Sequence, residues 1–268
     1  MALKIIIAGA LGRMGMEIAQ IVLEDNSLNL YACIEQPGHS AIGKDYGTCL
    51  GRGPLNIKII DSIDSLDCQD SILIDFSSVS SSHMFLEKAP QKSLKMVIGT
   101  TGLGCSELDL AQKASLSVPL IVSPNMSLGV NLLFYLTAQV AASLKDQFDI
   151  EIIEAHHRFK KDSPSGTAKR LGEIVSQSLG LSYEQAVKNG REGISENTRT
   201  STEIGMHAVR GGDIVGDHTV LFAGMGERIE LRHMAHSRKT FAQGAVIAAK
   251  WLAGKNPGLY SMRDVLGL

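Results

Sequence analysis

The chain has 268 residues, of which 44% are hydrophobic and 20% are charged, and its formal net charge is -2 at pH 7. This size and apolar content allow a sizeable core and leave room for two domains. The near-neutral charge excludes a general attraction to nucleic acid or to an anionic membrane, so a small-molecule ligand fits better than a polymer.

The cysteines and the chain's beginning indicate a compartment. Cys33, Cys49, Cys68 and Cys105 are scattered without C-x-x-C spacing, which predicts neither a zinc site nor a disulfide framework. The first predicted strand begins almost at Met1, and no apolar run is long enough to span a membrane. We therefore expect a cytoplasmic protein with reduced thiols, no metal and no membrane partner.

The first predicted elements are a strand, a loop and a helix. An apolar run at 4–8 predicts the strand, and apolar residues at helical spacing from Met14 onward predict the helix. Between them lies the glycine-rich loop Gly9-Ala-Leu-Gly-Arg-Met-Gly15. A second strand, 28–34, ends directly before Glu35. Together these form a βαβ unit with an acidic residue about twenty positions after the loop.

This unit predicts a dinucleotide site. Glycines allow a tight turn and a close approach of the backbone to a pyrophosphate, and the helix N-terminus supplies N–H donors. The spacing is G-x-x-G-x-x-G rather than the common G-x-G-x-x-G, and glycines that serve only helix packing remain the alternative. Glu35 is suited to accept hydrogen bonds from ribose hydroxyls, whereas Gln36 offers no cation to a 2'-phosphate. We expect NAD(H) to bind well and selectivity for NADP(H) to be weak.

Strands and helices alternate in the next part of the chain. Further strands are predicted at 57–60, 71–76, 95–98 and 119–122, and helices around 84–89 and 108–114. This alternation predicts an open, mainly parallel sheet with helices on both faces. Two polar loops follow strand ends, Gly99-Thr-Thr-Gly102 and Ser123-Pro-Asn-Met126. Because ligands bind outside the carboxyl ends of such strands, we expect these loops to line a nicotinamide pocket, although each is also compatible with an ordinary turn.

The sequence changes character after Met126. Further predicted elements are an apolar helix over 130–144, a strand over 148–153, a glycine-rich, strand-like region over 202–232 and a helix over 241–253 that returns to the first domain. The expected fold class is α/β, with a Rossmann-like parallel sheet domain and a second α+β domain built on a mixed or antiparallel sheet.

We assign residues 1–127 and 237–268 to a dinucleotide-binding domain, and residues 128–236 to a substrate-binding and oligomerisation domain. Hinges near 126–129 and 236–240 would let the two domains close over cofactor and substrate.

Chemistry-bearing residues are densest in Glu154-Ala-His-His-Arg-Phe-Lys-Lys-Asp-Ser-Pro-Ser-Gly-Thr-Ala168. The segment lies between a predicted strand and a predicted helix. Asp162, Ser163 or Ser165 can act as the helix N-cap, and Pro164 suits the first turn.

This junction is suited to an anion and a proton. Helix-terminal N–H groups can hold a carboxylate or a phosphate, and Gly166 permits close approach of a ligand to the backbone. His156, His157 and Lys160 would face the same ligand, and histidine exchanges a proton near neutral pH. The alternative is a solvated basic loop with a structural histidine pair.

Three segments together resemble the dihydrodipicolinate reductase family, the enzymes of the diaminopimelate route to lysine. They are the loop from Gly9 to Gly15, Val97-Ile-Gly-Thr-Thr-Gly102, and the segment 154–168, whose His-His-x-x-Lys-x-Asp-x-Pro-Ser-Gly-Thr run is the most specific. The resemblance spans essentially the whole chain and includes 208–218, 237–242 and 262–266.

The resemblance implies an NAD(P)H-dependent reduction of dihydrodipicolinate, formed from 4-hydroxy-tetrahydrodipicolinate, to tetrahydrodipicolinate. By this likeness His156 is the proton donor and acceptor, and Lys160 is a second proton donor. His157 would contact the substrate, a small dicarboxylate, and Gly166 and Thr167 would hold one of its carboxylates.

The resemblance also implies a cofactor, NADH or NADPH, and a homotetramer assembled through the second domain's sheet. The implied cofactor contacts are Gly9, Ala10, Leu11, Gly12, Arg13, Met14, Glu35, Gly99, Thr100, Thr101, Ser123, Pro124, Asn125 and Met126. The family usually has an arginine after the ribose-binding glutamate, and this chain has Gln36 there.

Two other functions are compatible with parts of the sequence. Another two-domain NAD(P)-dependent dehydrogenase, acting on a semialdehyde or a sugar, would share the first domain but lack the His-His-x-x-Lys run. A non-catalytic NAD(H) sensor would not need a cationic acid/base cluster.

Overall fold

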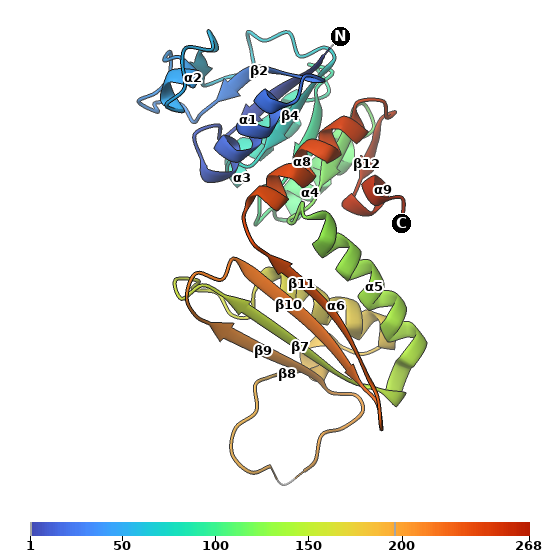
Figure 1. Cartoon of the computed structure of the whole chain (residues 1–268). Helices are drawn as coiled ribbons and strands as arrows, with labels where there is room; N and C mark the ends of the chain where they lie inside the picture. Colours follow the sequence, from blue (N-terminus) through green and yellow to red (C-terminus); the bar gives the residue numbers. More distant parts are fainter. Residues whose placement is uncertain (1, 196) are drawn as a thin grey trace. The chain divides into compact units, whose positions relative to one another are not determined.

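The computed structural model describes residues 2–195 and 197–268, and the chain divides into two compact units (Figure 1). The first unit comprises Met1–Leu128 and Arg238–Leu268, and the second comprises Gly129–Ser237. The C-terminal segment therefore belongs to the same unit as the N-terminal segment.

The first unit is built on a seven-stranded sheet in the order β12-β6-β5-β4-β1-β2-β3. Its strands are β1 (Leu3–Ala8), β2 (Leu28–Ile34), β3 (Ile59–Ile60), β4 (Ser71–Asp75), β5 (Lys95–Ile98), β6 (Pro119–Val122) and β12 (Gly258–Tyr260). Every neighbouring pair runs parallel. The predicted Rossmann-like parallel sheet is confirmed.

Helices cover both faces of this sheet. They are α1 (Arg13–Glu24), α2 (Tyr46–Cys49), α3 (Val79–Lys88), α4 (Cys105–Ala114), α8 (Lys239–Leu252) and α9 (Met262–Leu266). Ile5 and Ile7 share a core cluster with α1 and α8 residues such as Ile18. Ile6 belongs to a second cluster with α3 and α4 residues such as Phe85. Because side chains alternate along a strand and both faces of β1 are covered, its buried part needs apolar residues at successive positions, which explains the apolar run over 5–8.

Some elements differ from the sequence prediction. The strand expected over 57–60 is reduced to Ile59–Ile60, because Lys58 forms only an isolated bridge with Asp45. Helix α4 begins at Cys105, three positions before the predicted 108, where Glu107 Oε2 accepts the Gly104 N–H at 2.9 Å. The short elements α2, β12 and α9 were not predicted.

The second unit contains a five-stranded mixed sheet in the order β11-β10-β7-β9-β8. Its strands are β7 (Asp149–His156), β8 (Val187–Asn189), β9 (Ile204–Arg210), β10 (Gly216–Ala223) and β11 (Arg228–Ala235). Strand β7 pairs antiparallel with β10 and parallel with β9. The prediction of a second domain with a mixed or antiparallel sheet is therefore confirmed in its mixed form.

One face of this sheet is buried. The unit's helices are α5 (Leu128–Leu144), the 3-10 helix η1 (Lys145–Gln147), α6 (Gly166–Leu179) and α7 (Tyr183–Ala186). Ile150 and Ile152 of β7 share a core cluster with α5 and α6 residues. Glu154 and His156 follow at the same period of two and are buried as well. The alternation thus places two ionisable groups at the end of an apolar strand face.

Candidate active site

The glycine-rich loop connects β1 to α1 and is shaped by close backbone contacts. Gly9 has a φ of +68°, which favours glycine, and a Cβ there would lie 3.1 Å from the Phe76 carbonyl oxygen. A Cβ on Gly15 would lie 2.2 Å from the Gly9 carbonyl oxygen, so the helix packs too closely on the loop for any side chain. Gly12 is the N-cap of α1 and has no side chain to accept from the first-turn N–H groups. The helix start is therefore suited to an anion.

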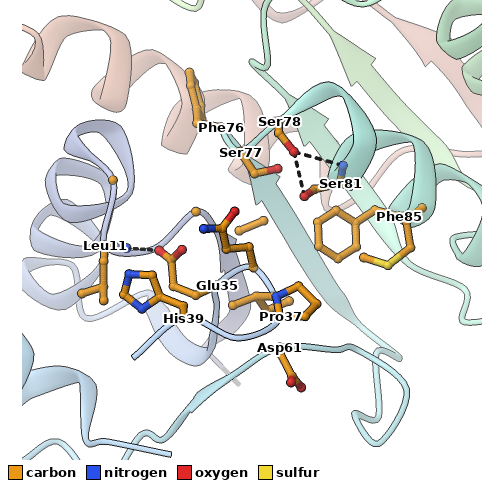
Figure 2. A pocket seen from close by; sticks show the side chains of 16 residues that line it. Leu11, Glu35, Pro37, His39, Asp61, Phe76, Ser77, Ser78, Ser81 and Phe85 are labelled. Carbon is orange, nitrogen blue, oxygen red and sulfur yellow. Dashed lines mark hydrogen bonds between the residues drawn. The ribbon is translucent and has the colours of Figure 1, made fainter. Parts of the chain in front are cut away.

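Glu35, directly after β2, faces this loop. Its Oε1 accepts a hydrogen bond from the Leu11 N–H at 2.6 Å. Both residues line a pocket of about 420 Å³ (Figure 2). The residues around it are Ala8, Gly9, Leu11, Gly12, Ile34, Glu35, Gln36, Pro37, His39, Asp61, Phe76, Ser77, Ser78, Ser81, Met84 and Phe85. The size and the chemistry suit the adenosine part of a dinucleotide.

Not every predicted loop residue lies at this pocket. Ala10 is fully buried, and its carbonyl oxygen accepts from the Tyr46 hydroxyl at 2.7 Å. Arg13 is exposed on the first turn of α1 and is not part of the lining. Met14 instead lines a second pocket, of about 350 Å³.

The second pocket lies at the carboxyl ends of β5 and β6, as expected for the two polar loops. Its lining consists of Met14, Phe76, Ser77, Gly99, Thr100, Thr101, Pro124, Asn125, Met126 and Phe241. A Cβ on Gly99 would lie 2.3 Å from the Phe76 ring, so a side chain at position 99 would displace this ring from the pocket lining. Ser123 is buried beside the pocket, and its Oγ donates to the Asn125 carbonyl oxygen at 2.8 Å.

Asp75, the buried last residue of β4, was not predicted as a site residue from the sequence. Its Oδ1 accepts from the Ser77 N–H at 3.0 Å and from the Ser77 hydroxyl at 2.5 Å. Its Oδ2 accepts from the Ser82 hydroxyl at 2.5 Å. Burial raises the pKa of Asp75. These contacts fix the segment Phe76–Ser77, which lines both pockets. The available signal was an aspartate followed by serines at the end of an apolar strand.

In the second unit, His156 is the last residue of β7 and belongs to a buried polar cluster. Its Nδ1 lies 2.5 Å from Glu154 Oε2. Glu154 Oε1 accepts the Ser165 N–H at 3.0 Å. Arg210 binds the same carboxylate in a bidentate manner, with Nη1 donating to Oε2 and Nη2 to Oε1, both at 2.8 Å. Such a paired geometry fixes a carboxylate in place.

The charges of this cluster define how His156 can act. Burial acts to raise the pKa of Glu154, but hydrogen bonds from Arg210, His156 and the Ser165 N–H outweigh it and hold the pKa below its ordinary value. Glu154 is therefore ionised at neutral pH. Burial lowers the pKa of His156, against the opposing effect of Glu154. Because Nδ1 faces a carboxylate, we assign the neutral ring's hydrogen to Nδ1, which leaves Nε2 to exchange a proton.

His218 of β10 completes the cluster. Its Nε2 lies 3.1 Å from the Ser165 hydroxyl, and its ring packs edge-on against His156 with centroids 5.2 Å apart. Burial lowers the pKa of His218 to about 3, so this ring is neutral. Beside it, a Cβ on Gly216 would lie 3.1 Å from His156 Nε2. The strand therefore leaves space at Nε2, the ring nitrogen that does not face Glu154.

The loop after β7 carries the other predicted residues. Lys160 Nζ lies 2.9 Å from Asp162 Oδ2, and the Lys160 N–H donates to the His157 carbonyl oxygen at 3.1 Å. The His157 ring is half-buried and lies 6.3 Å from the exposed Phe159 ring, centroid to centroid. Arg210 anchors this loop by donating to the Asp162 carbonyl oxygen at 2.6 Å.

Helix α6 begins at Gly166, with Ser165 as its N-cap, and Ser165 Oγ accepts the Ala168 N–H at 3.2 Å. Of the three predicted caps, Ser165 is the one observed. The placement of Pro164 in the first turn is wrong, because Pro164 precedes the cap. Gly166 and Thr167 open the helix, and a Cβ on Gly166 would meet nothing within 4 Å. Packing within the chain therefore does not require glycine at 166.

The described residues were also compared with the requirements of a membrane-spanning helix and of a metal site. No helix in residues 2–195 or 197–268 is both long and apolar enough to cross a membrane. In the same described residues, no group of three or more His, Cys, Asp or Glu side chains is arranged to hold a metal ion.

A parallel sheet with a glycine loop and a glutamate facing it, in a chain whose other unit holds a buried histidine and glutamate cluster, is typical of a two-domain nicotinamide-dependent oxidoreductase. Family models agree: the N-terminal model of dihydrodipicolinate reductase matches residues 3–126, and the C-terminal model matches residues 129–266. The chain belongs to the dihydrodipicolinate reductase family, as its resemblance predicted.

Individual relatives support this membership. The chain is 47% identical over 265 residues to the 4-hydroxy-tetrahydrodipicolinate reductase of Geotalea daltonii, covering 99% of both chains. It is 48% identical over 266 residues to that of Trichlorobacter lovleyi, with the same coverage. The fold matches that of dipicolinate-bound dihydrodipicolinate reductase from Paenisporosarcina sp. TG-14 with a TM-score of 0.78, 22% identity and coverage of 97% and 98%.

Proposed function

We propose that this chain catalyses the NAD(P)H-dependent reduction of dihydrodipicolinate, formed from 4-hydroxy-tetrahydrodipicolinate, to tetrahydrodipicolinate on the route to diaminopimelate and lysine. The observation that carries the proposal is the cluster of Glu154, His156 and Arg210 at the end of β7, next to the start of α6. It combines a proton-exchanging nitrogen with a site for negative charge. The identity of the substrate is inferred from the relatives, which are named 4-hydroxy-tetrahydrodipicolinate reductases.

The nicotinamide cofactor supplies the hydride when it is bound. We assign its pyrophosphate to the loop from Gly9 to Met14 and its ribose to Glu35, because α1 begins at Gly12 without a side-chain cap and the carboxylate lines the same pocket. The nicotinamide is assigned to the second pocket, between the loops at 99–101 and 123–126. Because Gln36 is not a cation, we expect both NADH and NADPH to be used without strong preference for NADPH.

The substrate carries two carboxylates, and the start of α6 is suited to hold one of them. Gly166 and Thr167 belong to the first turn, whose N–H groups and dipole attract an anion. The exposed backbone at Gly166 permits close approach. His157, on the preceding loop, is assigned to contact the substrate.

His156 and Lys160 are assigned to proton transfer. Hydride arriving at a ring carbon leaves an electron-rich conjugated system that must take up a proton. His156 Nε2 is suited to deliver it, because Glu154 fixes the ring and stabilises the imidazolium that exists while the ring carries the extra proton. Lys160 is assigned as the second donor of this proton transfer, in which one proton in total is taken up. The net reaction converts dihydrodipicolinate, NAD(P)H and one proton to tetrahydrodipicolinate and NAD(P)+.

We also propose that the chain acts in the cytoplasm as a homotetramer assembled through the second unit's sheet. The face opposite Glu154 and His156 exposes Ile153, Val209 and Met234 on three strands. Val209 and Met234 lie in one row across the sheet, through Ala155 and Asp217. Light scattering should give the mass of four chains, and a monomeric mass would contradict the assembly.

The experiment couples the purified protein to a dihydrodipicolinate synthase and follows the loss of NADH or NADPH absorbance. The wild-type chain should oxidise both in a substrate-dependent manner. His156→Gln and Lys160→Gln should each lower kcat about 10²- to 10⁴-fold, the usual contribution of general acid–base catalysis, with little change in NADH affinity. His207→Gln, which alters a histidine paired with Glu151 outside the cluster, should retain wild-type turnover. Near-normal turnover of both cluster variants would show that the catalytic assignment is wrong.

A further inference from the structure

The loop after Glu35 brings another polar side chain, His39, to the pocket beside the glycine loop. His39 lines this pocket together with Glu35 and Asp61 (Figure 2). Gln36 also belongs to the lining. Within this loop, only Glu35 has been assigned a contact with the cofactor. A side chain placed at the ribose end of a dinucleotide pocket can contribute to affinity and to the choice between NADH and NADPH.

Hydrogen bonds within the loop fix the backbone and the ring of His39. The His39 N–H donates to the Gln36 carbonyl oxygen at 3.1 Å, and the His39 carbonyl oxygen accepts the Ile42 N–H at 3.0 Å. His39 Nδ1 accepts the Ala41 N–H at 3.2 Å. Since Nδ1 is an acceptor, the neutral ring must carry its hydrogen on Nε2.

The remaining ring nitrogen is available to a ligand. Among residues 2–195 and 197–268, no group forms a hydrogen bond with His39 Nε2. The loop therefore uses one ring nitrogen to hold the imidazole and presents the other as an N–H donor. This donor complements Glu35, which can only accept when ionised.

The negative charge of the pocket makes this donor more important for a cofactor that carries a 2'-phosphate. The lining contains two carboxylates, Glu35 and Asp61, and no lysine or arginine. A 2'-phosphate bound there would meet negative charge on the protein. Among the side chains of the lining, only His39 presents a ring N–H donor. Gln36 offers a neutral amide donor.

We propose that His39 is a second ribose-binding residue, whose Nε2–H donates a hydrogen bond to the 2'-substituent of the adenosine ribose. The inference rests on the proposed placement of the dinucleotide at the glycine loop. A ribose hydroxyl can give its hydrogen to Glu35 and accept from His39 at the same time. A 2'-phosphate depends more on His39, because its charge strengthens a hydrogen bond from a donor and makes the carboxylates unfavourable neighbours.

The test measures binding rather than turnover. The full-length protein is titrated with NADH and NADPH in the absence of substrate, by nicotinamide fluorescence and calorimetry. His39→Ala should weaken NADH about threefold to tenfold, as for a neutral hydrogen bond, and NADPH about tenfold to a hundredfold, as for one to a charged group. His39→Gln, which keeps an N–H donor near the Nε2 position, should recover most of the NADH affinity. His83→Ala, on α3 and outside the pocket lining, is the control that should leave both affinities unchanged.

A second pair of probes identifies the atom that is contacted. His39→Ala should weaken ADP but not 2'-deoxy-ADP, because only ADP has the 2'-hydroxyl that the donor would meet. Equal losses for both nucleotides, or wild-type affinity of His39→Ala for NADH and NADPH, would overturn the inference while leaving the proposed function in place. If the wild-type chain binds neither NADH nor ADP, the placement of the dinucleotide fails and the inference fails with it. Thermal unfolding of each variant verifies that the fold is kept.

Discussion

At the scale of single residues, Glu154 determines what His156 can do. The carboxylate is fully buried and is shared by His156, the Ser165 N–H and Arg210. It therefore orients the imidazole, selects its tautomer and stabilises its protonated form. Glu154 contacts none of the reacting atoms in this mechanism, so it is a positioning residue.

Replacing Glu154 by glutamine tests this role. The amide keeps the shape but removes the charge. Its NH2 group also faces donors, because each oxygen of Glu154 accepts one hydrogen bond from Arg210 and another from His156 or the Ser165 N–H. We expect kcat to fall about 10- to 100-fold, as for other partners that orient a reacting group. The alkaline limb of the kcat–pH profile, where His156 loses the proton that it delivers, should move to lower pH, because the charge that raises the pKa of His156 is lost. A profile whose limb does not move would contradict the role, and Glu230→Gln on the exposed side of β11 provides the control.

At the scale of elements, two glycines near helix starts differ in whether the surrounding structure leaves room for a side chain. Gly15 in α1 cannot accommodate a Cβ, which would lie 2.2 Å from the Gly9 carbonyl oxygen. Gly166 at the start of α6 has open space on its side-chain side, where a Cβ would meet nothing within 4 Å. Gly15 is thus required by packing within the chain, whereas Gly166 is free to serve a ligand.

Alanine at each position should separate these demands. Gly15→Ala should lower the free energy of unfolding by about 1–3 kcal/mol, the usual cost of overpacking, and should abolish NADH binding. Gly166→Ala should leave the thermal midpoint unchanged or slightly raised, because alanine is the better helix former. It should nevertheless raise KM for the dicarboxylate substrate. An unchanged KM would remove Gly166 from the substrate site.

The length of an element decided whether it could be predicted from the sequence. Strands β1 and β2 and helices α1 and α6 were predicted, because each carries a periodic apolar pattern long enough to recognise. The short elements α2, β8, β12 and α9 carry too few residues for such a pattern.

The residues of the candidate site also fall into two groups, those that could be predicted from the sequence and those that could not. The glycine loop and the segment 154–168 are contiguous, so their residues could be predicted together. Arg210 reaches Glu154 across 56 positions, through the parallel register of β7 and β9. His218 arrives beside the same residue through β10. Pairing between distant strands is set by tertiary structure, and a single sequence does not reveal it.

At the scale of the whole molecule, the two units differ in their buried carboxylates. Glu151, Glu154 and Glu203 of the second unit are subject to burial, which acts to raise each pKa, but hydrogen bonds from cationic partners outweigh it and lower the pKa. In the first unit, burial raises the pKa of Asp75. The two groups of carboxylates therefore respond to acid with opposite signs.

We expect acid to weaken the surroundings of β7 before those of β4, where Asp75 is buried. A carboxylate whose folded pKa is lowered adds stability above its unfolded pKa, about 4.3 for Glu, and this stability is lost as the pH falls through the folded pKa. A carboxyl whose pKa is raised, such as Asp75, instead adds stability below its unfolded pKa, which is lost as the pH rises. Urea unfolding at pH 7 and pH 4, read by pulsed hydrogen exchange, should show β7 losing protection before β4 at pH 4. Earlier loss in β4 would contradict this assignment.

In the proposed reaction, this chain transfers a hydride from a nicotinamide to the substrate ring. The most direct measurement supplies NADH deuterated at both C4 positions, together with the substrate formed by the synthase, and analyses the tetrahydrodipicolinate by mass spectrometry. We predict one deuterium in each product molecule, formed only when the chain is present, and a rate strongly reduced in His156→Gln. Product without deuterium, or NADH oxidation that does not depend on the substrate, would contradict the claim.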